Sequence, residues 1–106
     1  MTMSIHIDSC VQRETLVVTT RSSVYQLIVL RGEGAVLVRG GRHFTEFRRA
    51  LFLGATAEGG SLDPRTIDIG LRMMFVLDDR LFITSEVQSV FRPHAKATSM
   101  ECAAAQ

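Results

Sequence analysis

Apolar and polar residues alternate along most of the chain, in runs of six to twelve residues separated by short turn signals. A period of two is the pattern of β-strands, and long helical periods are absent. The pattern predicts strands at 4–8, 14–20, 24–31, 35–39, 42–47, 49–56, 66–77 and 81–91. Because most connections are short, we expect an all-β protein, an antiparallel meander closed into a small barrel or a two-layer sandwich.

One segment fits a second interpretation. Residues 45–53 also match a short helix, because Phe47 and Leu51 are four residues apart and Gly54 would end the helix.

Two glycine-containing turns decide which side chains share a face between residues 24 and 47. The segment GEG (32–34) predicts a three-residue turn, and Gly40 with Gly41 predicts a two-residue hairpin turn. In this register the core face carries Val24, Ile28, Leu30, Val36, Val38 and Phe47, with His43 and Thr45. The opposite face carries Tyr25, Leu27, Val29, Leu37 and Phe44, surrounded by Arg31, Arg39, Arg42 and Glu46.

This opposite face is the candidate interface. A sheet face in contact with water normally carries polar residues, whereas an apolar centre with an arginine rim is typical of protein–protein interfaces. We therefore expect self-association, with a two-fold dimer as the simplest assembly. The residues expected to form the interface are Tyr25, Leu27, Val29, Leu37 and Phe44. Two alternatives stay open: another layer of the same chain covers this face as ordinary core, or a different partner binds it.

The strands at 66–77 and 81–91 both place apolar residues at odd positions. These residues are Ile67, Ile69, Leu71, Met73, Phe75 and Leu77 in the first strand, and Leu81, Ile83, Val87 and Phe91 in the second. Odd positions pair with odd positions only across a loop of odd length, so residues 78–80 are expected to form a three-residue loop with a residue at positive φ. Gly70 predicts a bend or a bulge within the first strand.

Length and composition fit one globular domain. The chain has 106 residues, 46% hydrophobic and 22% charged, and its two cysteines imply no disulfide framework. We expect the domain to span residues 1–92, with an alanine-rich tail at 93–106 that is a frayed helix or disordered. Neither a signal peptide nor an apolar run of about 18 residues is present, so we expect a soluble cytoplasmic protein.

Charge favours one alternative function. The net charge of +1 argues against a strongly basic nucleic-acid-binding protein, but residues 31–49 hold five arginines and two glutamates. Arg39 and Arg42 would face each other across the predicted turn and attract an anion. The alternative is therefore binding of an anion or a nucleic acid through Arg39, Arg42, Arg48 and Arg49. The acidic pair Asp78 and Asp79 is an equally good partner for these arginines. The arginine hairpin also needs no anion if it is solvated or if it pairs with another chain in a dimer.

His6, Asp8 and Cys10 alternate on one face of the first predicted strand, as a metal site or a nucleophile set would. Four residues of strand span about 13 Å, which is too far for His6 and Cys10 to share a metal ion, so only His6 and Asp8 can touch. The favoured interpretation is the polar face of an edge strand.

The loop at 58–65 predicts a type I turn at 63–65, and backbone amides near its glycine pair can form a weak anion nest. A small-molecule or hydrolytic site at this mouth of the barrel is a third alternative. The chain has no P-loop, no G-x-S-x-G and no Cys-x-x-Cys motif. We therefore expect no enzyme, no catalytic residue, no metal and no cofactor.

Several short motifs carry a resemblance over about residues 21–92. They are SVY (23–25), RGG (39–41) followed by Phe44, GAT (54–56), GGS (59–61) and IGLRMMF (69–75). In these motifs the chain resembles a group of small, functionally uncharacterised bacterial all-β proteins. The resemblance implies an all-β fold and a bacterial origin, and it implies no site residues.

Overall fold

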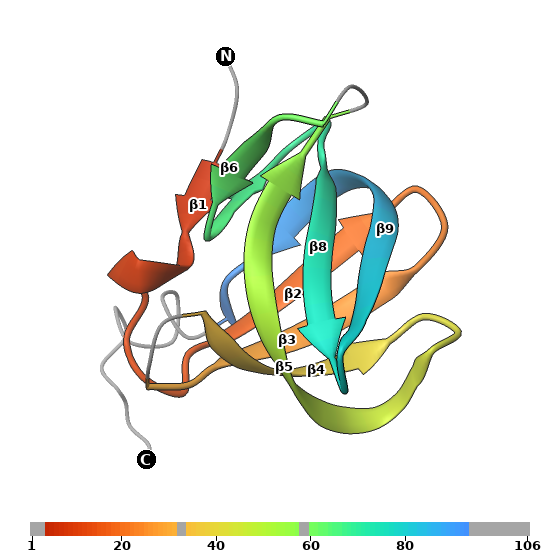
Figure 1. Ribbon diagram of the computed structural model, residues 1–106. Helices are drawn as coiled ribbons and strands as arrows, with labels where there is room; N and C mark the ends of the chain where they lie inside the picture. Colours follow the sequence, from red (N-terminus) through yellow and green to blue (C-terminus); the bar gives the residue numbers. More distant parts are fainter. Residues whose placement is uncertain (1–3, 32–33, 58–59, 94–106) are drawn as a thin grey trace.

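The computed structural model describes residues 4–31, 34–57 and 60–93, which form nine strands and one short 3-10 helix (Figure 1). The elements are β1 (Ser4–His6), η1 (Ile7–Ser9), β2 (Thr15–Thr20), β3 (Val24–Val29), β4 (Ala35–Gly40), β5 (Phe44–Thr56), β6 (Leu62–Pro64), β7 (Thr66–Asp68), β8 (Arg72–Leu77) and β9 (Arg80–Phe91). The predicted tail, from residue 94 onward, lies outside the described residues.

Six of these strands form a closed antiparallel barrel, as the alternation predicts. Going around the barrel, β2, β3, β4, β5, β8 and β9 each pair with the next, and β9 pairs with β2 to complete the circle. Figure 1 shows β5, β8 and β9 as the front wall, with β2 and β3 behind them. β6 extends the edge of β5, and β1 pairs with β7 in a small separate sheet. The predicted meander and its closure into a small barrel are confirmed.

The core fills the inside of the barrel with side chains from all six strands. Phe52 and Phe75 are the largest fully buried residues, and their rings pack 5.3 Å apart. Leu16 and Leu27, from β2 and β3, are completely buried on the opposite side of the barrel. Burying such side chains is the main favourable contribution to folding, at about 1.5–3 kcal/mol for each large one.

The register between β3 and β4 differs by one residue from the expected one. The Leu30 amide donates to the Ala35 carbonyl at 2.9 Å, and Leu27 pairs with Val38, so the connection has four residues and not three. A slip of one residue moves every side chain of a strand to the other face. β3 is therefore reversed relative to the prediction: Leu27 points into the barrel and Val24 is 52% exposed.

The hairpin between β4 and β5 also differs from the expected one. Gly40 pairs with Phe44, so the turn comprises residues 41–43, and a bulge follows opposite Arg39. Arg39 and Arg42 are therefore not opposed across a two-residue turn. The two strands expected at 42–47 and 49–56 are the single strand β5, which also excludes the alternative of a helix at 45–53.

The third difference lies in the β8–β9 hairpin. Leu77 pairs with Arg80, so the loop has two residues, Asp78 and Asp79, and both have positive φ (52° and 64°). Aspartate tolerates this conformation, which allows the two-residue turn that matches the twist of paired strands. Leu81 and Ile83 are in consequence exposed, contrary to the expectation. The expected break at Gly70 is present, because a turn with Gly70 at φ 93° separates β7 from β8.

Candidate functional site

The predicted interface is wrong in four of its five residues. Tyr25, Leu27, Val29 and Phe44 belong to the barrel core, and none is more than 8% exposed. The open alternative, that the same chain covers this face as core, is correct for these four. Leu37 lies on the outside of β4, where it is half-buried and pairs with Ile28.

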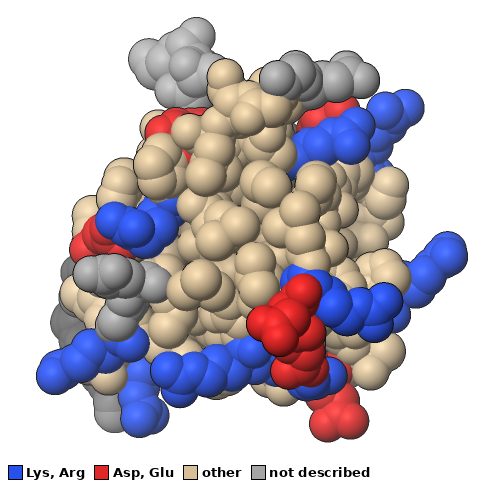
Figure 2. Space-filling view, viewed as in Figure 1, with Lys and Arg blue, Asp and Glu red and all other residues tan. Residues whose placement is uncertain are grey.

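An apolar surface exists elsewhere, on the outside of β5, β8 and β9. We call this surface the outer face, and it consists of Leu51, Met74, Val76, Leu81 and Ile83. Leu51 pairs with Val76, Val76 pairs with Leu81, and Met74 pairs with Ile83, so these side chains are cross-strand neighbours. Leu51 is 43% exposed, Leu81 53% and Ile83 50%. Figure 2 shows this front surface as largely uncharged, with charged atoms concentrated at its margin.

Charged residues of both signs border the outer face. At the tip of the β8–β9 hairpin, the Arg48 Nη2 atom lies 3.0 Å from the Asp78 Oδ2 atom. Asp79 and Arg80 are exposed beside this pair. At the other end of β8, Arg72 lies 3.5 Å from Glu86. The border of the outer face is therefore mixed in charge and is not purely basic.

Two of the four arginines proposed to bind an anion have partners within the chain. The Arg39 guanidinium donates to the side-chain oxygen of Gln26 and lies 4.4 Å from the centre of the Phe47 ring. Arg48 pairs with Asp78, which is the acidic alternative expected from the sequence. Arg42 and Arg49 are exposed and have no polar partner among the residues described. Two of the four cations are thus engaged within the chain.

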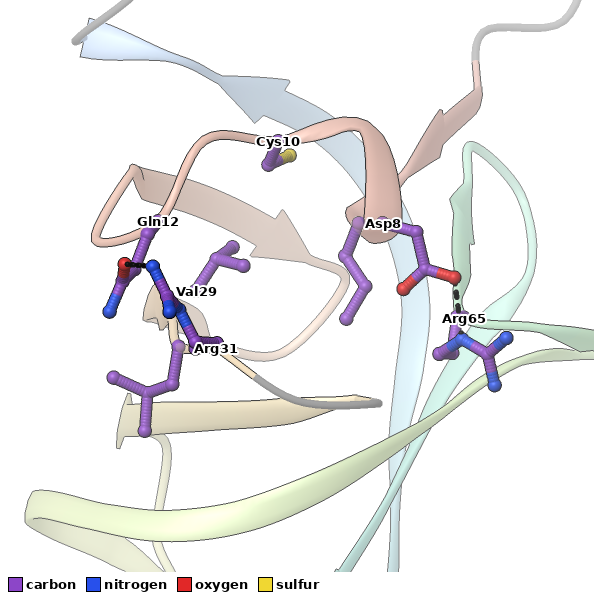
Figure 3. Close-up of a pocket in the computed structure, with 8 residues that line it drawn as sticks. Asp8, Cys10, Gln12, Val29, Arg31 and Arg65 are labelled. Atoms are coloured by element: carbon purple, nitrogen blue, oxygen red, sulfur yellow. Dashed lines mark hydrogen bonds and ion pairs between the residues drawn. The ribbon is translucent and has the colours of Figure 1, made fainter.

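A pocket of about 500 Å³ lies at one end of the barrel (Figure 3). Its polar lining consists of Asp8, Cys10, Gln12, Arg31 and Arg65, and its apolar lining of Ile7, Val29 and Leu30. In Figure 3 the hydrogen-bonded pair Gln12–Arg31 lies on one side and the pair Asp8–Arg65 on the other. These residues come from η1, the loop after it, the end of β3 and the β6–β7 connection. Their spacing in the chain gives no local motif, so no sequence pattern indicates this pocket.

Cys10 lies next to a buried carboxylate. Burial, and after it the negative charge of Glu14, raise the pKa of the Cys10 thiol to about 11. Glu14 accepts hydrogen bonds from Arg92, and these hold the pKa of the Glu14 carboxyl below its usual range. A thiol with this pKa is protonated at neutral pH and is a weak nucleophile. The arrangement therefore gives no support to a catalytic role for Cys10.

The remaining sequence candidates are His6, Asp8 and His43. The first strand ends at His6, and the His6 Nδ1 and Asp8 Oδ2 atoms lie 3.9 Å apart, so these two side chains are adjacent as expected. Across residues 4–31, 34–57 and 60–93, no three His, Cys, Asp or Glu side chains gather as a metal site would require. His43, expected on the core face, is exposed and packs on the Phe82 ring with 5.3 Å between centroids.

The expected turn at 63–65 is partly a strand. Residues 62–64 form β6, and Asp63 pairs with Ala55 of β5. Pro64 fits this position because β6 lies at an edge of the sheet, where a missing amide hydrogen has no partner to lose. Part of the loop, Glu58 and Gly59, lies outside the described residues, so the predicted anion nest stays a prediction.

Comparison with protein-family models, with curated protein sequences and with solved structures gave no match. The resemblance to uncharacterised bacterial proteins therefore stays a prediction. Within the described part of the chain, no helix has the length and apolar character needed to cross a membrane.

Proposed function

We propose that this protein is a non-catalytic β-barrel module that self-associates through the outer face, in a binding or regulatory role. The observation that carries the proposal is the exposure of Leu51, Leu81 and Ile83, each between 43% and 53%, on neighbouring strands of one barrel wall. Scattered apolar residues are normal on a protein surface, whereas a contiguous apolar patch marks an interaction site.

The mixed charges around the outer face support a second copy of the chain as the partner. In a two-fold dimer the same patch meets itself, so its border has to be self-complementary. A border with Asp78 and Asp79 beside Arg48 and Arg80 meets this requirement, because the acids of one copy can face the arginines of the other. An all-arginine border would repel its own copy.

The proposal keeps the kind of interface expected from the sequence and changes its residues. Both surfaces combine an apolar sheet face with charged residues at the margin. The expected face is inside the barrel, and the outer face of β5, β8 and β9 replaces it. Leu37, the one expected interface residue outside the core, lies on β4 and does not belong to the outer face.

Size-exclusion chromatography with light scattering tests the proposal. We expect the wild type to have a mass above the 11.7 kDa of a single chain and Ile83→Glu to have the monomer mass. Ile83 is half exposed, so a charge there leaves the barrel folded, which a circular dichroism melt checks. The matched control is Val24→Glu, which changes an equally exposed residue on β3 and should keep the wild-type mass. A monomeric wild type would contradict the proposal.

The same run tests the anion alternative. The chain has one tyrosine and no tryptophan, so it absorbs weakly at 280 nm and any bound nucleic acid raises the 260/280 nm ratio strongly. The proposal predicts a low ratio in the oligomeric peak. A high ratio that falls on addition of salt would favour binding of nucleic acid through Arg42 and Arg49.

A further inference from the structure

The pocket at the barrel end is distinct from the outer face and has an unbalanced charge. On one side, the Arg65 Nε atom donates to the Asp8 Oδ2 atom at 2.8 Å, which pairs one cation with one anion. On the other side, the Arg31 Nη2 atom donates to the Gln12 Oε1 atom at 3.2 Å, and Gln12 is uncharged. The described lining therefore carries one net positive charge, located at Arg31.

The floor of the pocket is apolar. Ile7 and Val29 are core residues, 2% and 5% exposed, and Leu30 is half-buried beside them. A ligand that fits this pocket needs an apolar body as well as a charge. The pocket volume of about 500 Å³ lies within the range of small-molecule sites, about 300–1,000 Å³.

Main-chain hydrogen bonds hold the two sides of the pocket in place. The Ile7 amide donates to the Arg65 carbonyl at 2.9 Å, which ties η1 to the β6–β7 connection. The Arg13 amide donates to the Val29 carbonyl at 2.5 Å, which ties the loop after η1 to the end of β3. A site whose walls are already in place loses little entropy when it binds a ligand.

We propose that this pocket binds a small organic carboxylate. The carboxylate would accept charge-assisted hydrogen bonds from the Arg31 guanidinium and a hydrogen bond from the Gln12 side-chain amide. The apolar part of the ligand would lie on Ile7 and Leu30. The Asp8–Arg65 pair would form the opposite wall and would not bind the carboxylate.

Nuclear magnetic resonance titration of the ¹⁵N-labelled full chain tests this site with butyrate as the probe. We expect saturable shifts of the amides of Cys10, Gln12, Leu30 and Arg31. Butyramide has the same shape without the charge and should bind at least tenfold more weakly. Inorganic phosphate, an anion without an apolar body, should also bind more weakly than butyrate. Equal binding of butyramide, or tighter binding of phosphate, would overturn the proposal.

Variants separate the site from general attraction of anions to the surface. Arg31→Gln should weaken butyrate binding about tenfold. Arg42→Gln removes another exposed arginine, outside the pocket, and should leave binding unchanged. Arg31 is exposed, so its substitution leaves the fold intact, and the spectrum of the free variant checks this. Equal affinities of the two variants, or shifts spread over the whole surface, would overturn the proposal. Repeating the titration with Ile83→Glu shows whether binding depends on self-association.

Discussion

Arg92, the residue after β9, contacts the Oε2 atom of Glu14 with both its Nε and Nη2 atoms at 2.7 Å. Glu14 precedes β2, and its side chain is only 3% exposed. A third hydrogen bond comes from the amide of Val11 to the Oε1 atom at 3.2 Å. The pair therefore joins the first and last strands of the barrel, at the β2–β9 seam.

Removing Arg92 should destabilise the barrel. Breaking a fully buried ion pair costs about 3–5 kcal/mol because a charge is left buried without a partner. The Arg92 side chain is 36% exposed, so we expect Arg92→Leu to cost less, about 2 kcal/mol, in urea denaturation. Arg48→Leu breaks the exposed pair with Asp78 and should cost at most about 0.5 kcal/mol. Similar losses in the two variants would contradict the structural role of Glu14 and Arg92.

The same pair should make the protein sensitive to acid. The hydrogen bonds from Arg92 lower the pKa of Glu14 in the folded state, so the carboxylate stabilises the fold at any pH above its unfolded pKa of about 4.3. This contribution is lost as the pH falls from about 4.3 through the lower folded pKa. We expect the melting temperature to fall over this range. Glu14→Gln should have a lower melting temperature at pH 7 and a flatter pH dependence. Parallel curves for the two proteins would contradict the assignment.

Asp68 should have the opposite effect. Burial and a hydrogen bond with Asp63 raise the pKa of Asp68 in the folded state, so ionisation of Asp68 opposes folding at neutral pH. We expect Asp63→Asn to raise stability at pH 7 by a few tenths of a kcal/mol. The gain should shrink as the pH falls through the raised pKa of Asp68 and disappear below the unfolded pKa of about 3.9. Asp79→Asn, in an exposed turn, is the control and should change little.

Gly54 should tolerate no side chain. Its φ is 144°, and a Cβ atom would lie 2.1 Å from the Asp63 carbonyl oxygen in β6. Gly70 also has a positive φ, 93°, but a Cβ atom there would meet only open space. Both alanine variants carry conformational strain, about 1–3 kcal/mol. Gly54→Ala adds a steric clash with the backbone of β6. In urea denaturation it should therefore be less stable than Gly70→Ala by at least about 2 kcal/mol. Equal stabilities would mean that β6 does not pack against β5 as described.

Cys10 should react slowly with iodoacetamide. Its pKa of about 11 leaves almost no thiolate at pH 8, and the thiolate is the reactive form. A Cys102→Ala variant leaves Cys10 as the single thiol, and the urea-unfolded protein gives its ordinary rate. We expect the folded rate to keep rising beyond pH 10, whereas a midpoint near 8.5 would show that Cys10 is not shielded.

The sequence predicted the fold class because alternation is a property of each strand by itself. It did not predict the register, which depends on the length of each turn. Gly32 and Gly34 both allow positive φ, so the segment around them permits a three-residue or a four-residue loop. In the structure the loop ends at Gly34, where a Cβ atom would lie 2.8 Å from the Phe52 carbonyl oxygen. Because Phe52 belongs to β5, nothing in the sequence around residues 31–35 indicates this contact.

The residues of the pocket could not be predicted from the sequence either, because they are far apart in the chain. Asp8 and Arg65 form one of its walls and are 57 residues apart in the chain. Asp8 and Cys10 alternate with His6 in the sequence, but the strand ends at His6, and η1 places Asp8 within hydrogen-bond distance of Arg65. The folded chain brings Arg31, Asp8 and Arg65 around one cavity.

Closure of the barrel has a consequence for biosynthesis. The seam joins Val17 to Phe91, two residues 74 positions apart, so the circle cannot form until nearly the whole barrel sequence has been translated. Until then β2 exposes a strand edge that other chains can pair with. Contacts of such long range also slow folding to the millisecond-to-second range that is common for all-β domains. The growing chain is therefore most vulnerable to aggregation just before its last strand emerges.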